Sequence, residues 1–169
     1  VIDVDPVTRA GMAQLQAAYT HGHPTGLAAA NLTAFVIADL GNGGNVDGLL
    51  ARVRTYAESQ REVYHERWLG DLWKRAHMMP DEKAFIARGW DESLGVIGRV
   101  EQAMKSPDYE MDPCLQTGAG WIAEEAFSTG LLCFLLYPDD PAAAINRAAV
   151  TSGDSDSIAC ITGAFAGAY

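Results

Sequence analysis

Apolar residues recur at three- and four-residue steps along residues 81–104, and this spacing is the feature that most constrains the fold. The stripe consists of Phe85, Ile86, Trp90, Leu94, Ile97 and Val100. A stripe of this kind predicts an amphipathic helix with one buried face. Apolar and polar residues do not alternate with a period of two in any segment long enough to form a sheet. We therefore expect an all-α protein.

Capping residues mark where the expected helices begin. Asp5 and Asp140 each precede a proline, which is the pattern of an N-cap followed by the first helical residue. Asp47 and Asp81 are expected to cap helices as well, and the glycine-rich segment 41–45 ends the helix before Asp47. The expected helices, interrupted by the aperiodic residues 105–120, cover residues 7–19, 24–40, 48–77, 81–104, 121–137, 142–150 and 155–169. The pattern predicts a compact orthogonal helical bundle with mostly short loops.

Charge and composition argue against several classes of protein. The 169 residues include 12 Lys+Arg and 22 Asp+Glu, a formal net charge of -10. Such a surface repels phosphate backbones, so nucleic acid is not expected as a partner. The longest apolar run, residues 130–137, is too short to span a membrane, and the N-terminus lacks the pattern of a signal peptide. Cys114, Cys133 and Cys160 are odd in number and widely spaced, so we expect reduced thiols in a cytoplasmic protein.

The stretch TSGDSDSIACITGAFAGAY, residues 151–169, contains the strongest candidate site. Asp154 and Asp156 alternate with serines after Gly153, whose backbone can make a tight approach to a neighbour. Carboxylates and a hydroxyl at a helix start can supply three oxygen ligands to a hard divalent cation. The competing interpretation is that Asp154 or Ser155 only caps the helix.

Small residues after these aspartates favour the cation interpretation. Ala159, Gly163 and Gly167 lie four residues apart, so one face of this helix has almost no side-chain bulk. Because small residues reduce helix propensity, tight buried packing is the plain explanation for them, and it would fix the direction of the carboxylates. An EF-hand loop would need a further oxygen ligand and a later glutamate, and a phosphatase-type aspartate motif would follow a strand. The sequence fits neither.

Three stretches, in order, resemble the ADP-ribosylglycohydrolase family, which includes the dinitrogenase reductase-activating glycohydrolases. Residues 153–168 resemble the family pattern G-D-[ST]-D-[ST]-x-A-x-x-x-G-A-x-x-G-A. YTHGHPTGLAAA, residues 19–30, resembles its T-H-x-x-P segment, and GAGWIAEEAF, residues 118–127, resembles its G-x-G-[WY] segment. On these motifs the chain is similar to that family over most of its length.

The resemblance implies an all-α hydrolase that cleaves the glycosidic bond between ADP-ribose and an acceptor with the help of two divalent cations, Mg²⁺ or Mn²⁺. Asp154, Asp156 and Ser157 would be metal ligands. Asp156 would be the catalytic residue, because it would touch both ions or hold the water between them. A pair of cations lowers the pKa of a bound water and stabilises charge on the ribose and the leaving group.

The resemblance also implies which residues bind the substrate. His21 would face ADP-ribose, and Gly153 would allow a close approach of the backbone. The turn Gly118–Gly120, with Ala119 at its centre, would let backbone N–H groups approach the diphosphate. The binding residues implied by the family are thus His21, Gly118, Ala119, Gly120 and Gly153.

Other polar residues near these motifs receive a structural interpretation. Glu124 and Glu125 lie at the start of an expected helix, where acids interact favourably with the macrodipole. His23 shares a loop with His21, and loop histidines are usually solvated or satisfied locally.

The sequence departs from the family in one respect. The family's T-D-D metal motif and its catalytic glutamate lie N-terminal of the T-H-x-x-P segment, where this chain has only Asp3 and Asp5 as carboxylates. We therefore expect residues 1–169 to be a single domain, the C-terminal half of a larger ADP-ribosylglycohydrolase domain, with the missing N-terminal segment as its partner. A member that binds ADP-ribose or a related nucleotide without hydrolysing it is the open alternative. A helical interaction module, in which residues 154–157 only cap a helix, is a third.

Overall fold

The protein is all-α, as the sequence predicts. The computed structural model describes residues 4–76 and 79–169, and the regular elements in these ranges are all helical. The elements are α1 (Pro6–Ala18), α2 (Pro24–Gly41), α3 (Leu49–Gln60), α4 (Glu66–Leu69), the 3₁₀ helix η1 (Leu72–Arg75), α5 (Glu82–Met104), α6 (Cys114–Thr117), α7 (Ala123–Leu136), α8 (Pro141–Ala149) and α9 (Ser155–Ala168). None of the helices in these ranges combines the length and the apolar character needed to cross a membrane.

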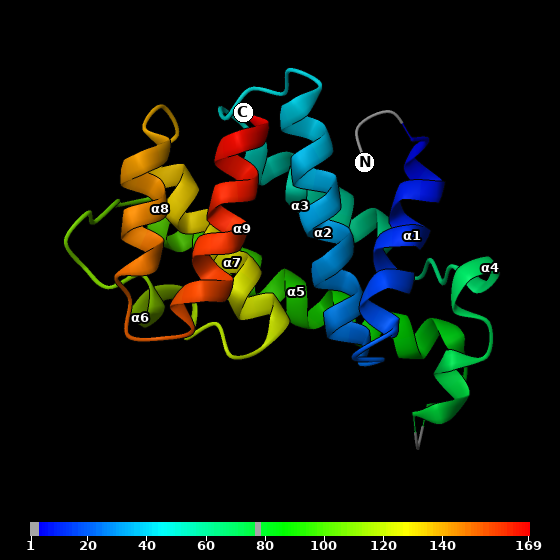
Figure 1. Ribbon diagram of the computed structural model, residues 1–169. Helices are drawn as coiled ribbons and strands as arrows, with labels where there is room; N and C mark the ends of the chain where they lie inside the picture. The colour runs from blue at the N-terminus through cyan, green and yellow to red at the C-terminus, as the bar shows by residue number, and fades with distance from the viewer. Residues whose placement is uncertain (1–3, 77–78) are drawn as a thin grey trace.

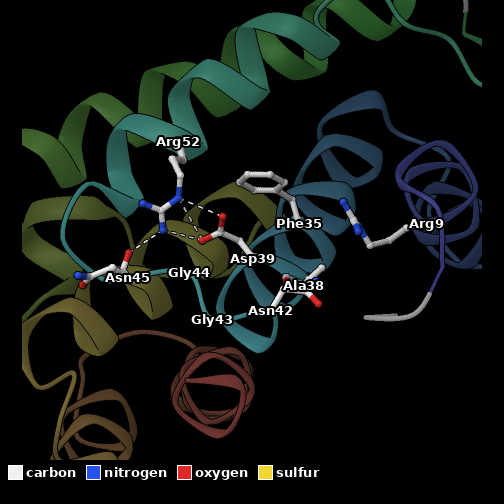
Figure 2. A pocket seen from close by; sticks show the side chains of 9 residues that line it. All are labelled: Arg9, Phe35, Ala38, Asp39, Asn42, Gly43, Gly44, Asn45 and Arg52. Atoms are coloured by element: carbon white, nitrogen blue, oxygen red, sulfur yellow. Dashed lines mark hydrogen bonds and ion pairs between the residues drawn. The ribbon is translucent and has the colours of Figure 1, made fainter.

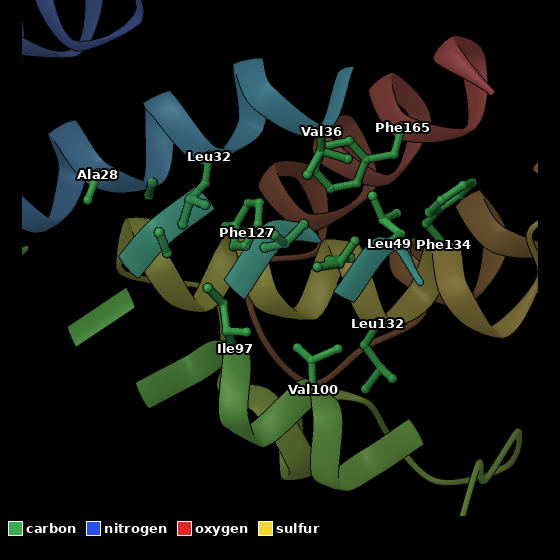
Figure 3. Packing of buried hydrophobic residues seen from close by; sticks show 14 of the residues in the cluster. Ala28, Leu32, Val36, Leu49, Ile97, Val100, Phe127, Leu132, Phe134 and Phe165 are labelled. Atoms are coloured by element: carbon green, nitrogen blue, oxygen red, sulfur yellow. The ribbon is translucent and has the colours of Figure 1, made fainter. Parts of the chain in front are cut away.

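The longer helices form two layers with the core between them. In Figure 1, α8, α9, α2 and α1 stand side by side in front, while α7, α5 and α3 lie behind them. Figure 3 shows Val36 of α2 and Phe165 of α9 converging in this core, close to Phe127 of α7. The rings of Phe127 and Phe165 meet edge to face with centroids 6.0 Å apart. This packing holds the starts of α2, α7 and α9 at the same end of the molecule.

Three predicted caps are confirmed. The Asp5 carboxylate accepts from two backbone N–H groups of the first turn of α1, at 3.1 and 3.0 Å. Asp81 caps α5 with a bond of 2.7 Å, and Asp140 caps α8 with a bond of 3.0 Å. The prediction for Asp47 is wrong, because α3 begins after Gly48, whose φ of 80° places it in the left-handed region.

The single helix predicted over residues 48–77 is also wrong. The chain leaves the helix after Gln60 and forms α4 and η1 instead, with a turn at Gly70 (φ 49°). A tertiary contact accompanies this change: Trp68, beyond the break, packs against α1 so closely that a Cβ on Gly11 would lie 2.4 Å from its ring. The predicted end of that helix, His77, lies outside the described residues. The aperiodic residues 105–120 contain one short helix, α6.

Candidate functional site

The start of α9 carries the predicted cation ligands. Asp154 is at the N-cap position, yet its side chain accepts no capping hydrogen bond, and Ser155 lies inside the helix. The interpretation of Asp154 as a simple side-chain cap is therefore wrong. A hydrogen bond with the Asp154 carboxyl, together with backbone bonds, lowers the pKa of Asp156 below its usual range. The two carboxyl groups thus lie together, with Asp156 exposed and Asp154 and Ser157 half-buried.

The predicted glycine turn lies directly against this helix start. The Asp154 N–H donates to the Ala119 carbonyl at 2.7 Å. A Cβ on Gly153 would lie 2.0 Å from the same carbonyl oxygen, so only glycine fits there. Gly118 and Gly120 have φ values of 118° and 81°, which side-chain-bearing residues rarely adopt. The glycine turn and the start of α9, which lie far apart in the sequence, therefore meet beside the two carboxylates.

Hydrogen bonds within the protein already engage most of the backbone N–H groups of the glycine turn. The Gly118 N–H donates to the Cys114 carbonyl at 3.1 Å, and the Gly120 N–H donates to the Glu125 carboxylate at 3.3 Å. Of the three N–H groups that the sequence predicts for a diphosphate, only that of Ala119 has no such bond to the described residues. The side chain of Glu125 therefore has a structural role, as predicted.

A cavity of about 800 Å³ lies between the α1–α2 loop, α5, α7 and the start of α9. It brings together four of the predicted residues, namely His21, Gly120, Asp154 and Ser157. The other predicted residues, Asp156, Gly118, Ala119 and Gly153, lie beside the cavity and are not part of its wall. All three family-like stretches thus contribute to one cavity, although their roles toward a ligand stay predictions.

The loop that carries the histidines is shaped by α5. His23 caps α2 by accepting the Thr25 N–H on its Nδ1 at 3.3 Å, which confirms that this histidine is satisfied locally. The Thr25 hydroxyl donates to the Glu92 carboxylate on α5. A Cβ on Gly89 would lie 2.2 Å from the Pro24 carbonyl oxygen, so α5 and the start of α2 touch backbone to backbone.

Sequence reasoning missed the acids on the cavity wall. Glu92 also accepts from Arg88 at 3.2 Å; burial opposes ionisation, but the bonds from Thr25 and Arg88 prevail and lower the pKa of Glu92. Burial raises the pKa of Glu124, and the nearby negative charge of Glu92 adds to this. Glu124 was predicted to be structural, yet it lines the cavity. The local sequence pattern carries no signal for these acids, because Glu92 and Glu124 lie on different helices and meet only in the folded chain.

An exposed aromatic ring completes the wall. Trp121 is 72% exposed, although it lies at the start of α7 beside the buried core. Such a ring offers a flat apolar face, and stacking on a planar ligand would bury it. The motif G-x-G-[WY] placed an aromatic residue here, but its exposure could not be inferred from the sequence.

The residues present fit one side of a divalent cation site. Asp154, Asp156 and Ser157 offer two carboxylates and a hydroxyl, which are suitable ligands for Mg²⁺ or Mn²⁺. In residues 4–76 and 79–169 there is no group of three or more His, Cys, Asp or Glu side chains that could hold a metal ion. A full coordination shell therefore requires oxygen ligands in addition to those of α9.

A second hollow lies at the other end of α2, and Figure 2 shows its lining. It measures about 540 Å³ and contains none of the predicted residues. The Arg52 guanidinium donates to the Asp39 carboxylate at 2.7 Å and to the Asn45 carbonyl at 2.6 Å. Arg52 and Asp39 are thus paired with each other, whereas the Nε of Arg9, which also lines the hollow, is buried without a hydrogen bond to the described residues.

Comparison with known families found a match to nearly the whole chain. The sequence model of the ADP-ribosylglycohydrolase family matches residues 3–169, a range that includes all three stretches around the cavity. No curated protein and no solved structure matches the chain. Because the family match extends over nearly the whole sequence, this chain belongs to the ADP-ribosylglycohydrolase family.

Proposed function

We propose that this protein takes part in the metal-dependent hydrolysis of the glycosidic bond between ADP-ribose and an acceptor, either a protein side chain or a small molecule. The observation that carries the proposal is the convergence of His21, Gly120 and Asp154 on one cavity in a member of the ADP-ribosylglycohydrolase family. The free thiols of the three cysteines agree with a protein of the cytoplasm.

The cavity suits the two chemical ends of ADP-ribose. The starts of α2, α7 and α9 border it, and helix starts carry partial positive charge that favours a diphosphate. The exposed ring of Trp121 offers a flat apolar face on which the adenine would stack. His21 is exposed in the same wall and would contact the sugar–phosphate portion.

Cations are part of the proposal because the cavity wall is acidic. Glu92, Glu124 and Asp154 line it, and Arg88 is the cation among the described lining residues. Such a wall repels a diphosphate unless bound cations offset its charge. We propose that Asp154, Asp156 and Ser157 hold part of a site for two Mg²⁺ or Mn²⁺ ions. The ions would supply a water of lowered pKa and stabilise developing charge on the ribose.

A second candidate function is binding of ADP-ribose or a related nucleotide without hydrolysis. The observation that favours it is the small ligand set: within the described ranges, the start of α9 contributes two carboxylates and lacks a third acidic or histidine ligand nearby. A nucleotide could still stack on Trp121 and bind near His21 if the catalytic cations were held weakly.

Release of ADP-ribose from an ADP-ribosyl-arginine substrate tests the proposal. The assay compares Mg²⁺, Mn²⁺ and EDTA, with this chain and with a longer polypeptide if the encoding gene continues upstream. We expect metal-dependent release from the form that contains the remaining ligands, and loss of release in Asp156→Asn. Binding of ADP-ribose by calorimetry without any release would instead support the second candidate. No release and no binding would contradict both.

A further inference from the structure

The loop before α9 is held by a segment about forty positions earlier in the chain. The Asp112 carboxylate accepts the Ser152 N–H on Oδ2 at 3.0 Å and the Cys114 N–H on Oδ1 at 3.0 Å. It therefore bridges the start of α6 and the loop that leads into Asp154. Burial opposes ionisation of this carboxyl, but the bonds from Ser152 and Cys114 prevail and lower the pKa of Asp112.

The segment that carries Asp112 is itself anchored to the core. The Ser128 hydroxyl of α7 donates to the Thr117 carbonyl at 3.1 Å, and the Thr129 hydroxyl donates to the Gly118 carbonyl at 2.9 Å. Thr117, Ser128 and Thr129 are all fully buried. Because α7 runs through the hydrophobic core, these bonds make the α6 segment a fixed base for the loop.

Two bonds thus flank Gly153 and join the loop to this base. On one side Ser152 donates to Asp112, and on the other Asp154 donates to the Ala119 carbonyl. The second bond uses only backbone atoms, whereas the first depends on a side chain. Asp112 is the member of this pair that a substitution can remove without touching the loop.

We propose that Asp112 is a positioning residue, which holds the loop before α9 and so sets the direction of the Asp154 and Asp156 carboxylates toward a cation. The inference rests on the proposed function, since it concerns the same ligands. Asp112 does not contact the cavity; it acts through Ser152 and the backbone that follows.

The test compares Asp112→Ala with a matched control, Asp108→Ala. Asp108 lies in the same segment and also accepts two backbone N–H groups, those of Glu110 and Met111, at 2.9 Å each, but it does not contact the loop. The first measurement is the amide hydrogen exchange of Asp154 without metal. The second is the Mn²⁺ concentration that half-broadens the NMR signals of residues 153–158.

We expect Asp112→Ala to raise both the exchange rate and the midpoint about tenfold, the effect of about one lost hydrogen bond, and Asp108→Ala to change neither. Asp112→Asn retains one acceptor oxygen and should give a smaller rise, which keeps the test open if the alanine variant fails to fold. Wild-type values in Asp112→Ala would overturn the proposal. A lack of response to Mn²⁺ both in this chain and in a longer polypeptide with the remaining ligands would overturn the proposed function. Equal exchange rates in the wild type and Asp112→Ala would overturn the role of Asp112.

Discussion

The two ends of α2 differ in how their charged groups are satisfied. At its C-terminal end, Arg52 is bound to Asp39 and to a backbone carbonyl, with both charges paired inside the protein. At its N-terminal end, Glu124, Asp154 and Asp156 have no ion pair with any cation among the described residues. Both ends are hollow, so the presence of a hollow alone does not distinguish them.

We interpret the paired cluster as structural and the unpaired carboxylates as part of the proposed cation site. Paired charges lower the free energy of the folded chain without outside help, whereas burial near Glu92 makes the ionised form of Glu124 costly. Natural proteins keep such a cost mainly where function requires it. The start of α9 therefore stays the proposed cation site, and the Arg52–Asp39 pair stabilises the turn at the end of α2.

Removal of the α9 carboxylates should have the largest effect. If Mn²⁺ binds only the folded chain, as proposed, a free concentration of a hundred times its Kd would raise the free energy of unfolding of the wild type by about 2.7 kcal/mol. Asp154→Ala and Asp156→Ala should abolish this rise in thermal melts. Asp39→Ala, at the other end of α2, should keep it, and a lost response in that variant would erase the contrast between the two ends.

Replacement of Gly153 should come next, with a loss of about 2.5 kcal/mol in Gly153→Ala. The added Cβ would lie 2.0 Å from the Ala119 carbonyl oxygen, which is backbone and cannot move aside cheaply. Gly163 in α9 is the control, since its Cβ would meet only the Ile145 side chain at 3.6 Å. Gly163→Ala should gain up to about 1 kcal/mol through helix propensity. Urea unfolding measures the free energy of unfolding of both variants. Similar losses in the two would mean that the contact with the Ala119 carbonyl does not require glycine at position 153.

The pair at the far end of α2 should contribute less. Arg52→Ala should lower the free energy of unfolding by about 1–2 kcal/mol, because Asp39 and the Asn45 carbonyl lose their donor. Lys74→Ala removes an exposed pair with Asp71 and should change it by less than about 0.5 kcal/mol. Neither variant should alter the response to Mn²⁺. Urea titrations with and without the ion would show whether either does.

The smallest effect concerns the two glutamates of the cavity wall, whose pKa values are shifted in opposite directions. The folded pKa of Glu124 is raised, so its cost to stability disappears as pH falls through that value, and Glu124→Gln should be more stable at neutral pH. The folded pKa of Glu92 is lowered, so its contribution is present at neutral pH and lost as pH falls through that value. Glu92→Gln should therefore be less stable at neutral pH. Unfolding curves across the acidic range with the same sign for both variants would contradict this assignment.

The sequence alone predicts the helices whose signals are local. The apolar stripe of residues 81–104 corresponds to α5, and Asp5 and Asp140 cap the helices that follow them. These signals act within one or two turns, so neighbouring residues are enough to read them. The aspartates of residues 154–156 and the family resemblance could likewise be recognised in the sequence, because the motif is contiguous. The family match confirms the resemblance.

Tertiary structure decided the features that depend on contacts between distant segments. The helix that periodicity predicts over residues 48–77 ends at Gln60, and Trp68 packs on Gly11 instead of continuing it. Glu92 and Glu124 meet in one cavity, and Asp112 bonds to Ser152, only because two layers of helices bring these segments together. Such contacts join residues tens of positions apart, and their free energy depends on packing and burial that the local pattern does not contain. The sequence therefore determined the class, the helix starts and the candidate ligands, while only the fold decided which groups hold those ligands in place.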